Sequence, residues 1–88
     1  MKRKDGFVSR QVGGKVVAVP VGERTEHFSG MITLNGTAAL LWDELAEERT
    51  ETELVEALTA AYDVTPEAAL ADVRAFVKKL ADAHLLEP

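Results

Sequence analysis

The stretch GMITLNGTAALLW, residues 30–42, decides the fold, because a strand pattern gives way to a helix pattern within it. The strand pattern begins at residue 28, and its residues alternate between two faces, as in a half-buried β-strand. The face expected to pack on the core holds Phe28, Gly30, Ile32 and Leu34. The opposite face holds Ser29, Met31 and Thr33. A strand is therefore predicted over residues 28–34.

The helix that follows should begin after Asn35, whose side chain can accept a hydrogen bond from an amide two or three residues later. Apolar residues then recur at helical spacing. They are Ala38, Leu40, Leu41, Trp42 and Leu45. This broad stripe predicts a helix over Gly36–Glu47 that contacts the core on more than one side.

A β-hairpin is predicted before this stretch. The pair Gly13-Gly14 tolerates the positive φ angles of a two-residue turn, and it separates strand-like runs over residues 7–12 and 15–19. Pro20 lacks an amide donor and Gly22 adds backbone freedom, so the second strand should end near them.

Two further helices are predicted by their start signals. Thr50-Glu51-Thr52-Glu53 is a capping box, and Thr65-Pro66-Glu67 combines a cap, a proline in the first turn and an acid near the positive end of the helix dipole. The apolar face of the earlier helix holds Leu54, Val55, Leu58, Ala61 and Tyr62. That of the later one holds Ala69, Leu70, Val73, Phe76, Val77, Leu80 and Ala83. Strands followed by helices predict an α+β fold, and we expect one domain over residues 1–88.

Composition limits the possible functions. The 88 residues include no cysteine, so a small core must be stable by packing alone. The formal net charge is -5, and its average field repels nucleic-acid phosphates. Because neither a signal peptide nor a membrane-spanning run of apolar residues is present, we expect a cytoplasmic protein that does not enter a membrane.

Residues that perform chemistry do not form a recognisable pattern. His27 and His84 are isolated, without the spacing of zinc ligands. Ser9 and Ser29 lie in predicted strands without a nucleophile elbow, and no glycine-rich phosphate loop joins a strand to a helix. We therefore expect no catalytic activity, no cofactor and no metal.

The third predicted strand offers another kind of site, because residues 28–34 carry no charge that would protect an open sheet edge. An extended peptide can add to such an edge and insert alternate side chains into a groove beside the third helix. Two alternatives remain. The strand lies in the middle of the sheet, or the loop over residues 21–26 covers its edge.

Three parts of the sequence together resemble the PqqD family. They are residues 30–42, Tyr62-Asp63-Val64, and the spacing Asp72-Val73-x-x-Phe76-Val77-x-x-Leu80. The resemblance implies a winged-helix-like fold with a three-stranded antiparallel sheet followed by three helices, the RiPP recognition element. Such domains bind the leader of a ribosomally made precursor peptide and present it to a modifying enzyme, such as a radical SAM protein or a leader peptidase. One member serves pyrroloquinoline quinone (PQQ) biosynthesis, but the product here stays open.

The resemblance also implies where a leader would bind, since in this family it joins the edge of the third strand and lies against the third helix. The implied peptide-binding residues are Phe28, Gly30, Met31, Ile32 and Thr33 on the strand, with Val73, Arg74, Phe76, Val77 and Lys78 on the helix. Arg74 and Lys78 are one turn apart, and they either pair with acidic leader residues or stay solvated.

The sequence departs from the family pattern at Glu48-Arg49, where Asp-Gly commonly precedes the threonine that opens the second helix. The end of the first helix and any enzyme-docking surface there are therefore open. Two other functions also stay open. One is a winged-helix DNA-binding protein, against which the acidic charge argues, and the other is a homodimer formed through the same sheet edge.

Overall fold

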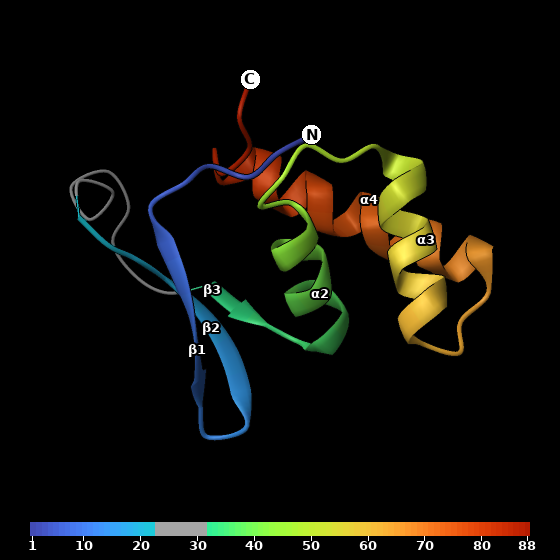
Figure 1. Cartoon of the computed structure of the whole chain (residues 1–88), viewed down its shortest axis with the longest axis horizontal. Coiled ribbons are helices and arrows are strands. Elements are labelled where there is room, and N and C mark those ends of the chain that lie inside the picture. Colours follow the sequence, from blue (N-terminus) through green and yellow to red (C-terminus); the bar gives the residue numbers. More distant parts are fainter. Residues whose placement is uncertain (23–31) are drawn as a thin grey trace.

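The computed structural model describes residues 1–22 and 32–88, which form a small sheet at one end of a layer of helices (Figure 1). The strands are β1 (Phe7–Val12), β2 (Lys15–Pro20) and β3 (Ile32–Leu34), and the helices are α2 (Gly36–Glu44), α3 (Glu51–Ala61) and α4 (Pro66–Asp82). Helix α2 lies between the sheet and α3, and α4 runs behind both helices (Figure 1). The predicted α+β class, with an antiparallel sheet before three helices, is confirmed.

The predicted hairpin joins β1 and β2, with Val12 opposite Lys15 across the turn. Gly13 and Gly14 have φ angles of +57° and +82°, which glycine adopts without the steric penalty of a Cβ atom. Strand β3 pairs antiparallel with β2, and Thr33 lies opposite Val17. The sheet order is therefore β1-β2-β3, and β3 is an edge strand within the described part of the chain.

Helix α2 supplies the centre of the core, as its broad apolar stripe predicted. Leu41 and Trp42 are buried, and so is Leu45 just beyond the helix. The phenyl ring of Phe7 from β1 meets the Trp42 ring edge-on, with 5.5 Å between centroids. Around them pack the buried side chains of α3 and α4, namely Leu54, Leu58, Ala69, Val73, Phe76 and Leu80.

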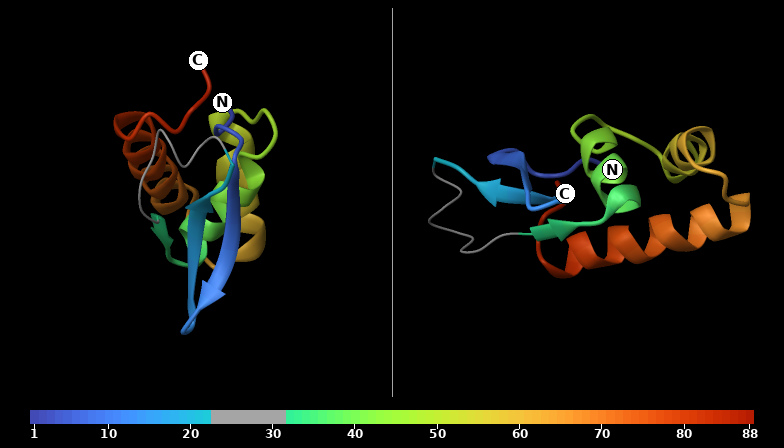
Figure 2. Two further views of the ribbon diagram at one scale, coloured as in Figure 1. Left: turned by 90° about the vertical axis from the view of Figure 1, so that its left-hand side faces the viewer. Right: turned by 90° about the horizontal axis from the view of Figure 1, so that it is seen from below.

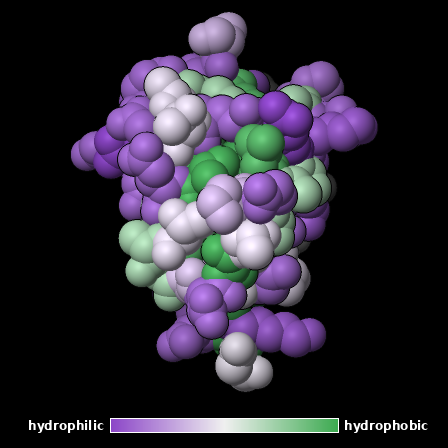
Figure 3. All heavy atoms as spheres, turned by 90° about the vertical axis from the view of Figure 1, so that its right-hand side faces the viewer, coloured by the Kyte–Doolittle hydropathy of each residue, from purple (hydrophilic) through white to green (hydrophobic). Residues whose placement is uncertain are grey.

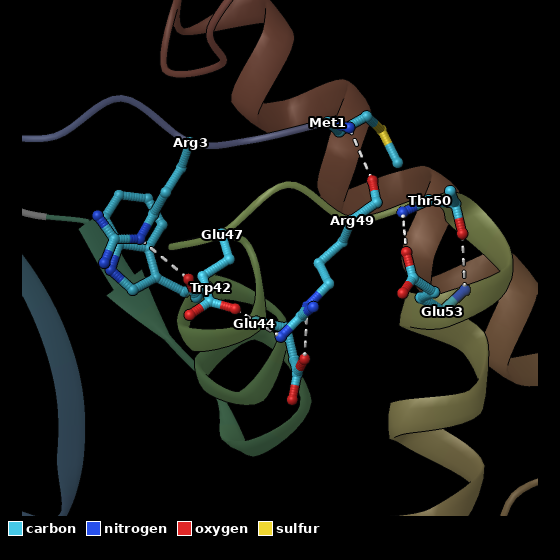
Figure 4. Close-up of polar contacts among 8 residues, drawn as sticks. All are labelled: Met1, Arg3, Trp42, Glu44, Glu47, Arg49, Thr50 and Glu53. Carbon is cyan, nitrogen blue, oxygen red and sulfur yellow. Dashed lines mark hydrogen bonds and ion pairs between the residues drawn. The ribbon is translucent and has the colours of Figure 1, made fainter.

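The C-terminal end of α2 differs from the prediction, since the helix ends at Glu44 rather than Glu47. Beyond Glu44 the chain tightens into turns, and the Glu47 amide donates to the Glu44 carbonyl at 3.3 Å. Arg49 holds this turn, because its guanidinium donates to carboxylate oxygens of Glu44 and Glu47, each at 3.1 Å (Figure 4). Where the sequence departs from the family pattern, at Glu48-Arg49, the chain thus forms a compact turn held by ion pairs.

The N-terminal segment, residues 1–4, packs against α2 and the C-terminal segment. The Arg3 amide donates to the Leu45 carbonyl at 2.8 Å, and Arg3 also forms an isolated antiparallel bridge with Leu86. Its guanidinium lies 4.7 Å from the centre of the Trp42 ring, and its Nε donates to the Trp42 carbonyl at 3.0 Å (Figure 4). This cation is therefore part of the fold and covers the central tryptophan.

The predicted start signals of all three described helices form. Asn35 Oδ1 accepts from the Ala38 amide at 2.9 Å, and Thr65 Oγ1 accepts from the Ala68 amide at 3.2 Å. In α3 the capping box is reciprocal, since Thr50 Oγ1 accepts from the Glu53 amide and Glu53 Oε1 accepts from the Thr50 amide (Figure 4). This second bond lowers the pKa of the Glu53 carboxyl, because it stabilises the ionised form.

We predict that Thr50→Ala lowers the free energy of unfolding by about 1 kcal/mol, because it leaves the Glu53 amide without its partner. Urea unfolding followed by the fluorescence of Trp42 measures this loss. The matched control is Thr52→Ala in the same turn, which removes an exposed hydroxyl and should cause no loss. Equal losses in the two variants would contradict the role of the cap.

We predict that the stability gap between the wild type and Glu53→Gln depends on pH. Folding lowers the pKa of Glu53 from its ordinary value of 4.5, so its contribution is complete above that value. It is lost as the pH falls through the lowered pKa of the folded state. Urea midpoints for both proteins, measured from neutral pH down to about pH 3, should therefore converge in acid. A constant gap would refute this linkage.

Candidate functional site

Strand β3 has one paired side and one open side in the described structure. Its register with β2 runs from Ile32 opposite Ala18 to Leu34 opposite Val16. Alternate residues of an antiparallel strand direct their N–H and C=O groups to opposite sides, so some of them point away from β2. The views in Figure 2 place this outer side next to the C-terminal half of α4. Two alternatives were predicted for this strand, and the mid-sheet position does not hold for the described residues. The other, a loop over residues 21–26 that covers the edge, lies outside the described residues from residue 23 onward.

A groove of about 240 Å³ lies between this edge, the start of α2 and one side of α4. Its lining is Thr33, Asn35, Thr37, Ala38, Leu41, Asp72, Ala75, Phe76 and Lys79. The side chains of Leu41 and Phe76 are buried and form an apolar floor, whereas Asp72 and Lys79 are exposed. The site therefore combines an open strand edge, an apolar floor and charges of both signs.

Two of the residues predicted to bind a peptide, Thr33 and Phe76, line this groove. Ile32 and Val73 are buried in the core, and Val77 packs against it half-buried. The alternation of β3 is as predicted where it is described, with Ile32 and Leu34 buried and Thr33 exposed. The remaining predicted strand residues, Phe28, Gly30 and Met31, lie outside the described residues. Peptide contact stays a prediction for the whole set.

The two predicted cations of α4 lie outside the groove lining, and both form ion pairs within the protein. Arg74 donates from Nε and Nη2 to the Glu51 carboxylate of α3, at 3.2 and 3.3 Å. These bonds raise the pKa of Arg74 above its ordinary value, because they stabilise the charged guanidinium. Lys78 Nζ donates to Asp82 Oδ2 at 2.9 Å, one turn along the same helix.

Sequence reasoning missed three groove residues of α4, namely Asp72, Ala75 and Lys79. Their signal was the helical period, because residues three or four positions from Phe76 lie on its side of the helix. Asp72 and Lys79 satisfy this spacing. Ala75, next to Phe76 in sequence, lies three positions from Asp72 and four from Lys79. Arg74 and Lys78, each two positions from Phe76, lie on other sides.

The described residues contain no group of three or more His, Cys, Asp or Glu side chains that could hold a metal ion. In the same part of the chain, no helix has the length and apolar character needed to cross a bilayer. The chemistry that the groove offers is backbone pairing along β3 and apolar contact with Leu41 and Phe76.

The sequence profile of the family described as "Coenzyme PQQ synthesis protein D (PqqD)" matches residues 15–86. The chain belongs to the PqqD family. The matched region includes both walls of the groove, from β2 through α4. A solved structure titled "TbiB1 in Complex with the TbiA(beta) Leader Peptide" is similar to this PqqD-family chain, with 29% sequence identity and a TM-score of 0.74. That similarity covers 99% of this chain and 95% of the other.

No curated protein matches the chain significantly. The family assigned from residues 30–42 and the later motifs is nevertheless confirmed by the profile match. The winged-helix-like arrangement is confirmed by the described sheet and helices together with the similar structure.

Proposed function

We propose that this protein is a peptide-binding adaptor, a RiPP recognition element that captures the leader of a ribosomally made precursor peptide. The observation that carries the proposal is the open side of β3 next to the apolar groove along α4. A structure of the same fold that is in complex with a leader peptide supports it, as does membership of the PqqD family. The DNA-binding alternative has no such support, and the net charge of -5 opposes it.

In the proposed mode the leader lies extended against the outer side of β3 and forms backbone hydrogen bonds with it. Alternate leader side chains then point toward Leu41 and Phe76 on the groove floor. Thr33, exposed on the strand, faces the bound chain. The backbone bonds hold any extended sequence, and the groove selects among side chains.

The two parts of the site must act together. The structure describes three residues of β3, Ile32–Leu34, and the outer side of these three offers only a few backbone bonds. Each bond contributes about 0.5–1.5 kcal/mol net, whereas micromolar binding requires about 8 kcal/mol. Burying one large apolar side chain adds about 1.5–3 kcal/mol. Pairing with these three residues alone is therefore insufficient, and apolar leader residues on the groove floor would supply much of the rest.

Charges contribute less in this proposal. Asp72 and Lys79 stand beside the groove and can meet polar leader residues of either sign. Arg74 and Lys78 are paired with Glu51 and Asp82, and neither lines the groove. We therefore rank Lys79 above them as a leader contact.

We propose further that the domain is not catalytic and works in the cytoplasm beside a modifying enzyme. A radical SAM protein or a leader peptidase would fit the family. Holding the leader raises the effective concentration of the attached core peptide at that enzyme. A homodimer through β3 would use the same backbone groups, so it would compete with the leader.

We predict that Ala75→Trp weakens leader binding at least about tenfold, because a large side chain at this exposed position fills the groove. Ala81→Trp is the matched control, an exposed alanine on the same helix that does not line the groove. Calorimetry with the leader of the precursor encoded beside the gene measures both. Wild-type affinity in Ala75→Trp, or equal losses in both variants, would rule out the groove as the binding site.

We predict that saturating leader slows hydrogen exchange at the β3 amides that point away from β2. Amide exchange followed by NMR on the full chain tests this directly. The outer amides of β1, at the other edge of the sheet, are the internal control and should keep their rates. Slower exchange at β1 with no change at β3 would mean that the leader adds to the opposite edge of the sheet, which would contradict the proposed site.

A further inference from the structure

A second hollow lies at the opposite end of the helical layer, between α3 and the first turns of α4, with a volume of about 330 Å³. Val55, Pro66 and Leu70 supply its apolar lining, and Glu51, Glu56 and Glu67 also line it. Figure 3 looks onto this end of the molecule and shows apolar residues at the centre of a hydrophilic surround. We call this site the α3–α4 hollow.

The apolar lining of the α3–α4 hollow is partly open to solvent. Val55 and Leu70 are both half-buried, although they lie on the helices that pack together here. A half-buried valine and leucine beside an exposed proline leave apolar surface that an apolar side chain of another molecule can cover.

The electrostatic surroundings of the hollow are mainly acidic, because Glu51, Glu56 and Glu67 line it. Residues 50–73 contain six carboxylates and no lysine, arginine or histidine. Glu51 is paired with Arg74, but Glu56 and Glu67 are exposed and form no ion pair with any residue that the structure describes. A partner seated over Val55 and Leu70 would meet these two free charges.

We propose that the α3–α4 hollow is a second docking site, which binds a basic amphipathic helix of another protein. An apolar side chain of that helix enters between Val55 and Leu70. Lysine or arginine residues beside it meet Glu56 and Glu67, so charge complementarity selects the partner and speeds its association.

The charge distribution favours another protein over a second copy of this chain as the occupant. The densest basic stretch of the sequence is Lys2-Arg3-Lys4. Its amides at residues 3 and 4 donate to the carbonyls of Leu45 and Leu85, at 2.8 Å each. This stretch is thus held against its own molecule, and it is an extended segment rather than a helix.

The α3–α4 hollow and the groove at β3 share no lining residue. On α4, Leu70 and Phe76 are six positions apart, which places them about 120° apart around the helix. Both sites can therefore be filled at once. A protein docked at the hollow would be held next to a captured leader. This role in bringing the two together rests on the proposed function, whereas docking at the hollow does not.

The test uses the full chain and a synthetic helical peptide of about 18 residues, with leucines on one face flanked by lysines and arginines. An NMR titration should shift the amides of Val55, Glu56 and Leu70, and replacing the leucines of the peptide by alanine should abolish the shifts. The double variant Glu56→Lys, Glu67→Lys should weaken binding at least about tenfold. The matched control, Asp43→Lys with Glu87→Lys, has the same net charge and exposed positions away from the hollow, and it should bind like the wild type.

Glu67→Lys places a positive charge at the start of α4, which can weaken the helix. The neutral double variant Glu56→Gln, Glu67→Gln avoids this charge and should weaken peptide binding less than the lysine variant. Shifts confined to other surfaces, or equal weakening in the double variant and its control, would overturn the proposal. The proposal would also be overturned if the chemical shifts of the residues that line the hollow changed with protein concentration alone, because a second copy of the chain would then be the occupant. Leader binding by calorimetry separates the two proposals, since Glu56→Lys, Glu67→Lys should bind leader normally even if the α3–α4 hollow binds nothing.

Discussion

The arrangement of the molecule depends on a junction of one residue, because β3 ends at Leu34 and α2 begins at Gly36. Asn35 between them caps the helix, and its Oδ1 accepts from the Ala38 amide at 2.9 Å and from the Thr37 hydroxyl at 3.1 Å. A link of one residue leaves little freedom for α2 to rotate relative to β3, so the direction of α2 fixes the position of the sheet edge. The hydroxyl of Tyr62, just beyond α3, approaches this junction, and a Cβ atom on Gly36 would lie 3.0 Å from it.

The same helix unites the core and the groove. Leu41 is buried in the core and also lines the groove, so the surface offered to a peptide is the outer boundary of the core itself. One position along, Trp42 contacts Phe7 of the sheet and the Arg3 guanidinium of the N-terminal segment. The floor of the groove is therefore part of the packed core, so peptide binding would not require this floor to reorganise.

Sequence alone predicted the elements whose signals are local. The pair Gly13-Gly14 gave the turn, and Asn35, Thr50 and Thr65 gave the helix starts, because each acts on amides a few residues away. The early end of α2 was missed, since its apolar spacing continues through Leu45 and gives no stop signal. Ion pairs of Arg49 with Glu44 and Glu47 stabilise the turn at this point, and the spacing of apolar residues carries no information about such pairs.

The candidate site shows the same division between local and tertiary information. Periodicity identified the buried stripe of α4 but did not say which flank of that stripe faces β3 and which faces α3. That choice is a rotation of the helix, and it is set by tertiary packing. Phe76 and Arg74 were therefore assigned to one groove, whereas the structure places Phe76 beside β3 and pairs Arg74 with Glu51 of α3.

The two hollows lie on different sides of α4, so one helix can serve two separate contacts. Phe76 lines the groove beside β3, whereas Leu70 lines the α3–α4 hollow. Because the groove floor at Leu41 and Phe76 belongs to the core, apolar contact there would select the proposed leader, and backbone pairing with β3 would add affinity for any extended chain. Modest affinity would be sufficient if a second protein were held close by, because effective concentration then replaces contact area.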